Sequence, residues 1–296
     1  MLAAVIGFVL TTAPAQSAAP ASSTPVPSGG PTHYGHTMIS AGALTPAAAG
    51  ALNCPLTVSG NCLGSYNWAG YAVASADWKT TKVVADWTVP TITGSTASTC
   101  PDAQKTWDSN SVWIGIDGLF SPSVEQTGTS SDCFYGQTSY YAWYEFYPAG
   151  SVVSSNTVSP GDHISATVTY MGNNTKGYPT FKTTLDDLTA GWTFSSPKTA
   201  APDALMNSAE WIDESPYYEG FLGLTHVGSV AFSNAKATIG GVTAVIGSWP
   251  AGDIYWLNSV DYNWPYDEVL AYTKAVPGAL NSAGNGFKVT WESDGP

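Results

Sequence analysis

Apolar and polar residues alternate in many short stretches of this chain, from about residue 65 to its end. Because successive side chains of a strand point to opposite faces, such alternation predicts half-buried strands. The stretches that show it are residues 67–75, 82–89, 112–118, 124–128, 138–147, 163–170, 208–213, 229–232, 253–257, 269–273 and 287–292. Short strands separated by Gly, Pro and Asn turns, with no long helical window, predict an all-β fold, an antiparallel sandwich.

The stretch 112–118, which turns back into 124–128, is the centre of this pattern. Val112, Ile114 and Ile116 share one face of the predicted strand, which we expect to be the core face. Trp113 and Asp117 share the other face, with only a glycine between them. A large aromatic ring and a carboxylate beside a glycine suit the floor of a groove. The alternative is an amphipathic strand whose second face simply meets solvent.

The composition changes sharply near residue 65 and divides the chain into three segments. Residues 1–18 contain an apolar run and small residues suited to cleavage, which predicts a secretory signal that is too short to span a bilayer. Residues 19–64 have no Asp, Glu, Lys or Arg and are rich in Ala, Pro, Ser, Thr and Gly. This uncharged leader is either a linker or a propeptide. Residues 65–296 are predicted to form one domain.

The charge balance excludes several classes of partner. Nine basic residues face 22 acidic residues, for a net charge of −13 at pH 7. Such a chain cannot neutralise phosphates, so we expect no nucleic acid and no binding to an anionic membrane surface. The four histidines are scattered and no C-x-x-C spacing occurs, so we expect no metal and no cofactor. We also expect no obligate partner, and therefore a monomer. Weak positive charge at low pH is compatible with an acidic environment.

Four cysteines in a chain predicted to be exported indicate disulfide bonds. Cys54, Cys62, Cys100 and Cys133 allow three connectivities. We favour the pairs Cys54–Cys62 and Cys100–Cys133, because the second pair would fasten the base of the hairpin around residues 112–128.

Carboxylates are the remaining candidates for catalysis, and two stand out among aromatic residues. Glu210 lies between an alanine and Trp211 in the middle of a predicted strand, and desolvation there would raise its pKa. That environment suits a general acid or base. Glu145 lies between Trp143 and Tyr147 on one strand face. For both acids the alternative is an ordinary solvent-facing position on a strand.

Five motifs, taken together, resemble those of a known family. In order along the chain they are Asn67-Trp-Ala-Gly70, Trp113-Ile-Gly-Ile-Asp-Gly118, Gln126-Thr-Gly128, Tyr141-Ala-Trp-Tyr-Glu-Phe-Tyr-Pro148 and Ala209-Glu-Trp-Ile212. Their order and spacing over about residues 65–292 are similar to those of the glutamic peptidases, the G1 or eqolisin family of secreted acid endopeptidases.

The resemblance implies a fold, a cleft and a set of site residues. The fold would be a sandwich of two large antiparallel sheets, similar in shape to concanavalin A-like lectins and glucanases, with a substrate cleft on its concave face. By motif, the catalytic dyad falls on Gln126 and Glu210. The positions that match cleft-lining residues of the family are Trp113, Asp117, Trp143, Glu145 and Tyr147. The strand pattern alone does not single out Gln126.

The resemblance also implies an activity, which is hydrolysis of peptide bonds in proteins, outside the cell, without inhibition by pepstatin. Glu210 would act as general base and then general acid, and Gln126 would orient the attacking water and stabilise the oxyanion. Fungal members tend to carry a basic propeptide, whereas the leader here has no Lys or Arg. How latency would be maintained therefore stays open.

Two other functions fit a concave, aromatic-lined sandwich. A β-glucan hydrolase would use two acids, for which Glu145 and Glu210 are candidates, although no strand carries a closely spaced acidic pair. A carbohydrate-binding module would instead stack its aromatic rings on sugars. Loss of function on replacing Glu210 by Gln would indicate catalysis, whereas a binding module would depend mainly on its Trp and Tyr residues.

Overall fold

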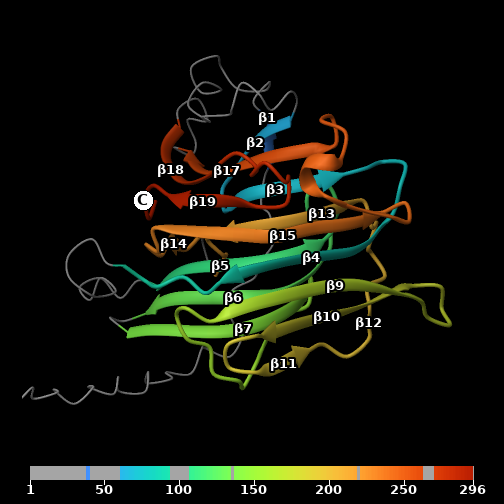
Figure 1. Ribbon diagram of the computed structural model, residues 1–296, viewed down its shortest axis with the longest axis horizontal. Helices are drawn as coiled ribbons and strands as arrows, with labels where there is room; N and C mark the ends of the chain where they lie inside the picture. The colour runs from blue at the N-terminus through green and yellow to red at the C-terminus, as the bar shows by residue number, and fades with distance from the viewer. Residues whose placement is uncertain are drawn as a thin grey trace, which may run out of the picture.

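The structure of the protein is a computed structural model that describes residues 38–40, 61–93, 107–134, 137–218, 221–262 and 270–295. Strands make up nearly all of its regular structure, and the one helical segment in these ranges is a 3-10 turn, η2 (Ile246–Ser248). Two curved layers of strands lie one over the other (Figure 1). No helix within the described ranges is long and apolar enough to cross a bilayer.

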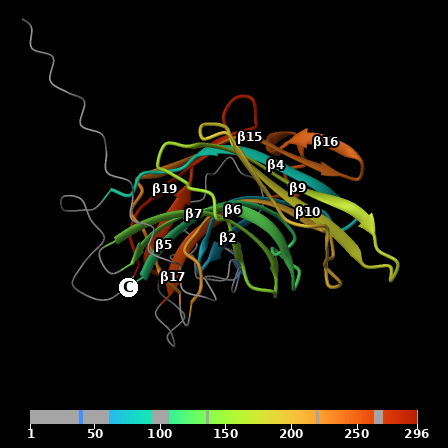
Figure 2. The ribbon, with the colours of Figure 1, turned by 90° about the horizontal axis from the view of Figure 1, so that it is seen from below.

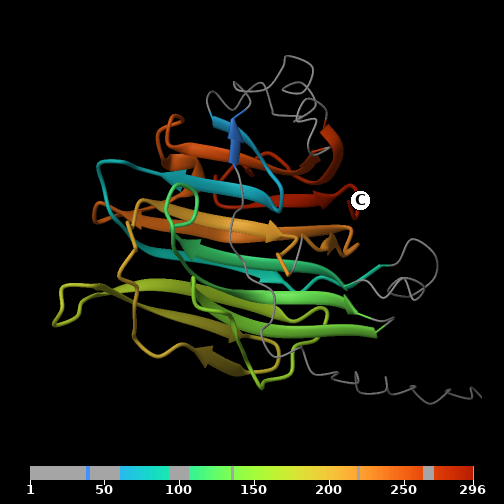
Figure 3. The ribbon, with the colours of Figure 1, turned by 180° about the vertical axis from the view of Figure 1, so that it is seen from behind.

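One layer, which we call the site layer, carries the motif strands and faces the viewer in Figure 3. Its strands, in spatial order, are β1 (Met38–Ser40), β2 (Asn61–Ser65), β17 (Ile254–Tyr262), β3 (Trp68–Ala74), β13 (Ser208–Glu214), β5 (Trp107–Ile116), β6 (Val124–Phe134), β7 (Gln137–Tyr147) and β8 (Val152–Val153). Consecutive strands in the chain pair from β5 to β8, whereas β3 pairs with β13 and β17 pairs with β3 across long stretches of chain.

The second layer covers one face of the site layer. Its strands are β19 (Phe287–Trp291), β15 (Ser229–Ile239), β4 (Thr80–Thr88), β9 (His163–Asn173) and β10 (Pro179–Asp187), with β16 (Val242–Val245) beside β15 and with β11 (Trp192–Ser195) and β12 (Thr199–Ala200) beside β10. Strand β18 (Leu270–Pro277) pairs with both β17 and β19 and so joins the layers. The short strand β14 (Gly223–Leu224) runs parallel to β5.

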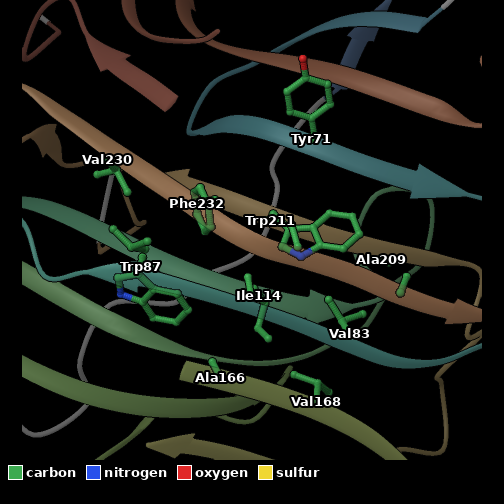
Figure 4. Packing of buried hydrophobic residues seen from close by; sticks show 14 of the residues in the cluster. Tyr71, Val83, Trp87, Ile114, Ala166, Val168, Ala209, Trp211, Val230 and Phe232 are labelled. Atoms are coloured by element: carbon green, nitrogen blue, oxygen red, sulfur yellow. The ribbon is translucent and has the colours of Figure 1, made fainter. Parts of the chain in front are cut away.

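The main hydrophobic core fills the space between the layers (Figure 4). Ile114 and Trp211 from the site layer meet Val83, Trp87 and Phe232 from the second layer, and all are buried. Each such side chain stabilises the fold by about 1.5–3 kcal/mol relative to an exposed position. The site layer is curved, and its other face, which we call the concave face, is turned away from the second layer (Figure 2).

The predicted all-β sandwich is confirmed, and the structure refines it in several places. The strands are antiparallel except for the parallel pairs β17–β2 and β14–β5. Strand β10 was not predicted, because two of its core-facing residues, Thr183 and Asp187, are polar and hide the alternation. Strand β15 also extends to Ile239, beyond the predicted end at residue 232.

The predicted boundaries before residue 65 fall partly within the described residues. Strand β2 begins at Asn61, and β1 pairs with it antiparallel, so part of the predicted leader adds strands to the site layer. The predicted signal, residues 1–18, lies outside the described residues. Cys62 and Cys133 are disulfide-bonded. Cys54 and Cys100 lie outside the described residues, so the pairing stays a prediction.

Candidate active site

Five residues from neighbouring strands of the site layer stand in register across the concave face. Glu210 of β13 lies opposite Gly115 of β5, which lies opposite Gln126 of β6, and Glu145 of β7 follows. On the other side Glu210 faces Ala72 of β3. We call these five residues the site row. Because residues in register on adjacent strands point to the same face, the side chains of Glu210 and Gln126 share one surface.

Gly115 separates the two residues predicted to form the dyad. Adjacent strands lie about 4.8 Å apart, so the Cα atoms of Glu210 and Gln126 are about 10 Å apart. A Cβ atom at Gly115 would lie 3.0 Å from the Trp113 ring, 3.3 Å from Val124 and 3.4 Å from the Cβ of Gln126. Because Gly115 has no side chain, the space between the Glu210 and Gln126 side chains stays open.

Gln126 is held by the next acid of the site row. Its Nε2 donates a hydrogen bond of 2.8 Å to Oε2 of Glu145, and both residues are fully buried. A carboxylate accepts only, so this bond fixes which end of the Gln126 amide is the NH2 group. The solvent-facing alternative for Glu145 is therefore wrong.

Glu210 is fully buried, and neither of its carboxyl oxygens has a hydrogen-bond partner among the described residues. Burial raises its pKa well above the usual range, and the charges of Asp117 and Glu125 add to that rise. The Ser208 hydroxyl and the Leu119 amide lie close enough to lower the pKa in part, although neither meets the geometry of a hydrogen bond. The sequence predicted this direction, and the solvent-facing alternative for Glu210 is wrong.

Asp117 lies just past the end of β5 and shapes the start of β13. Its φ of 69° takes it out of the strand geometry, so its side chain does not follow the strand alternation that grouped it with Trp113. Its two carboxylate oxygens accept hydrogen bonds from the amides of Met206 (2.7 Å) and Asn207 (2.8 Å). Asp117 thereby anchors the turn that leads into Glu210. A contact between Asp117 and substrate stays a prediction.

Trp113 does lie on the concave face, as predicted, and it packs edge-on against Trp68 with ring centroids 4.9 Å apart. Its Nε1 donates to Glu214 Oε2 at 2.7 Å, and the side chain of Asn67 donates to Oε1 at the same distance. Burial raises the pKa of Glu214 to about 8 despite these donors. The first and second motifs, which contain Asn67 and Trp113, thus meet at a buried acid of β13.

The remaining predicted site residues, Trp143 and Tyr147, also contact the concave face. Trp143 is fully buried and its Nε1 donates to the Ser130 hydroxyl at 2.9 Å. Tyr147 ends β7 opposite Val124 and is half-buried against the concave-face cluster. The structure therefore places the predicted site residues other than Asp117 on this face or at its edge, although the dyad itself has no exposed surface.

Three residues near the dyad were not singled out from the sequence as site residues. Leu119 approaches Glu210, and its neighbour Phe120 contacts Tyr255 of β17. No periodic pattern marks a loop residue such as Phe120, and the place of Tyr255 depends on a pairing with β3 that is distant in sequence. Within the described ranges, no three metal-ligating side chains are grouped so as to hold an ion.

Two known peptidases are similar in sequence to this chain. Aspergillopepsin-2 of Aspergillus niger is 34% identical over 196 residues, which cover 60% of this chain and 66% of that protein. Scytalidopepsin B of Scytalidium lignicola is 33% identical over 127 residues, or 42% of this chain and 41% of that protein. This chain thus spans slightly less than two thirds of the first relative and about two fifths of the second.

Solved structures confirm the fold. A scytalido-glutamic peptidase bound to a peptide-based transition-state analogue aligns with a TM-score of 0.58 at 22% identity, over 77% of this chain and 98% of its own. An eqolisin, SCP-B, in complex with the tripeptide Ala-Ile-His aligns with a TM-score of 0.55 at the same identity and coverage. The Peptidase A4 family matches residues 66–254, which include every residue of the site row. The resemblance seen in the motifs is confirmed, and the chain belongs to the Peptidase A4 family, the G1 glutamic peptidases.

Proposed function

We propose that this protein is an acid endopeptidase whose catalytic dyad is Glu210 and Gln126. The observation that carries the proposal is the site row, in which the two side chains flank Gly115 on one face. A peptide carbonyl placed over Gly115 would have a carboxyl group on one side and a carboxamide on the other. That arrangement supplies a proton acceptor and an oxyanion donor to the same carbon atom.

The reaction is balanced without any further group. The ionised Glu210 takes a proton from a water molecule as the water oxygen bonds to the carbonyl carbon. The oxyanion that forms accepts a hydrogen bond from the Gln126 NH2 group, which has a second proton beyond the one donated to Glu145. Glu210 then gives its proton to the leaving nitrogen and the C–N bond breaks. The products are a carboxylic acid and an amine.

Burial of Glu210 sets a condition on this mechanism. Its pKa is raised in the buried state, so the base form needs hydrogen-bond donors when substrate and water are bound. The attacking water is one such donor, and the Leu119 amide and the Ser208 hydroxyl lie close enough to be others. We therefore expect kcat/KM to rise with pH on its acidic limb as Glu210 ionises.

The glycosidase alternative loses support from the same geometry. Glu145 and Glu210 stand three strand spacings apart in the site row, about 14 Å between Cα atoms. Paired glycosidase carboxyls lie within about 5–9.5 Å of each other. Glu145 is in addition bonded to Gln126, which gives it a positioning role instead.

The test is digestion of an unfolded protein at pH about 3–4 with pepstatin present, using the full chain, because strands β1 and β2 of the predicted leader belong to the site layer. Glu210→Gln should abolish cleavage with the fold intact, and Gln126→Ala should lower kcat more than it raises KM. Glu292→Gln, at an exposed glutamate, is the matched control and should keep full activity. Substantial activity in Glu210→Gln would refute the assignment. We also infer export, from the predicted signal in residues 1–18.

A further inference from the structure

The loop between β5 and β6 presents one large apolar side chain to solvent. Gly118, with a φ of 113°, turns the chain, and its amide donates to the Ser121 hydroxyl at 2.7 Å. Leu119 then packs into the concave-face cluster, where Trp68 also lies. The next residue, Phe120, is left 52% exposed. A tightly bonded loop therefore holds a phenyl ring at the surface.

Phe120 contacts an aromatic residue that lies in line with the site row. Its ring meets the Tyr255 ring edge-on, with centroids 5.2 Å apart and planes at 74°. Tyr255 of β17 stands opposite Ala72, which stands opposite Glu210. Only the methyl group of Ala72 separates Tyr255 from Glu210 along this line, which covers two strand spacings or about 10 Å.

A second observation, independent of strand register, places the same loop beside the dyad. The Leu119 amide lies close enough to the Glu210 carboxyl to lower its pKa. Phe120 follows directly in the chain, so the exposed ring belongs to the residue after the one whose amide approaches the acid. Aromatic side chains from both the loop and β17 therefore lie on the Glu210 side of the site.

The opposite end of the site row has different chemistry. There the Gln126 amide donates to the buried side chain of Glu145, and both residues are fully buried. The exposed ring of Phe120 therefore lies toward the Glu210 end of the row, whereas the Gln126 end holds a buried polar pair. A peptide lying along the row would meet these two environments with different side chains.

We propose that Phe120 and Tyr255 form the binding site for an apolar substrate side chain, aromatic or Leu, on the Glu210 side of the scissile bond. The inference rests on the proposed peptidase function and adds a determinant of its specificity. An edge-to-face pair offers apolar surface against which a further ring or a branched chain packs well. An extended peptide advances about 3.3 Å per residue, so the contact falls within about three residues of the scissile bond.

The experiment compares hydrolysis of peptides that carry Phe, Leu or Ala at each of the three positions on either side of one cleavable bond. Wild type should favour Phe or Leu over Ala by about 10- to 100-fold in kcat/KM at one position, on one side only. Phe120→Ala and Tyr255→Ala should each reduce that ratio about tenfold or more. Phe120→Leu should retain most of the preference.

Tyr178→Ala serves as the matched control, because Tyr178 is a 41% exposed aromatic residue before β10 in the second layer. It should leave every ratio unchanged. Circular dichroism confirms that each variant is folded. If wild type cleaves the peptides and neither Phe120→Ala nor Tyr255→Ala alters the Phe/Ala and Leu/Ala ratios of kcat/KM, this inference is overturned and the proposed function stands. No cleavage of any peptide by folded wild type would overturn the proposed function and this inference with it.

Discussion

Asp213 gives the sharpest test of how this fold depends on pH. It lies on β13, three residues after Glu210, but its side chain points to the core side, where Oδ1 accepts a 2.5 Å hydrogen bond from Asn110. Burial raises its pKa from 3.8 to about 7, and the charge of Glu214 adds to the rise. A carboxyl group whose pKa is raised by folding stabilises the protein below its unfolded pKa and loses that contribution as pH rises toward the folded value.

The size of the effect follows from those two pKa values. One pH unit of difference is worth about 1.4 kcal/mol, so Asp213 should lower the free energy of unfolding by about 4 kcal/mol between pH 3 and pH 7. Glu214, with a folded pKa of about 8, also costs stability over this range because it ionises in the unfolded chain, so the Asp213 share is read from the difference between variant and wild type. A loss of about 4 kcal/mol is a large part of the 5–15 kcal/mol that stabilises a typical domain.

Asp213→Asn removes the titration and keeps an oxygen that can accept from Asn110. The variant should lose a constant amount of stability from altered hydrogen bonding, but it should lack the Asp213 contribution to the pH slope. Urea unfolding followed by tryptophan fluorescence at each pH unit from 3 to 7 measures this. We expect the stability difference, variant minus wild type, to rise by about 3–4 kcal/mol over that range.

Asp203→Asn is the control for the Asp-to-Asn change itself, because Asp203 is an exposed aspartate outside β13. The reasoning is refuted if Asp213→Asn and wild type lose stability in parallel as pH rises. It is equally refuted if wild type is more stable at pH 7 than at pH 4.

Three further predictions concern the site row and its anchor. Gly115→Ala should fold, since the contacts of its new Cβ atom are 3.0 Å or longer. Its kcat/KM should fall about 100-fold, because a methyl group enters the space between Glu210 and Gln126. Hydrolysis at nearly the wild-type rate would contradict the dyad geometry. Glu145→Gln should lower kcat roughly tenfold with little change in KM, because the Gln126 amide then meets a carboxamide in place of a carboxyl group. Steady-state kinetics measure this, and a change in KM alone would indicate that Glu145 contacts the substrate. Asp117→Asn should lower the free energy of unfolding by about 1–3 kcal/mol. The asparagine oxygen can accept a hydrogen bond from one of the amides of Met206 and Asn207, but the NH2 group cannot accept from the other. An unchanged midpoint of urea unfolding would show that this anchor is dispensable.

The sequence predicted local features well because they depend on neighbouring residues. Alternation placed Val112, Ile114 and Ile116 on the core face and Trp113 on the other, and the structure confirms both. The same reasoning failed at Asp117, where a positive φ ends the alternation. A strand pattern cannot reveal such a backbone change by itself, since aspartate also occurs in regular strands.

The site row could not be derived from strand patterns, because it depends on long-range pairings. Glu210 reaches Gly115 only because β13 inserts between β3 and β5, which are its partners across more than 90 residues of chain. The motif resemblance identified Glu210 and Gln126 without showing how they meet. It also gave no sign that Glu145 is bonded to Gln126, or that Phe120 reaches Tyr255.

Strand β13 links the proposed chemistry to the stability of the fold. It carries three acids in five residues, Glu210, Asp213 and Glu214, and all are buried with raised pKa values. Asp213 and Glu214 favour the fold when they are neutral, which holds at acidic pH, whereas the proposed mechanism needs Glu210 to ionise when substrate binds. The register of β13 against β5 places Glu210 opposite Gly115. A pH at which β13 unfolds would therefore also displace the catalytic base. The lower limit of activity should therefore follow the ionisation of Glu210, and the upper limit should follow unfolding driven by its two neighbours on the same strand.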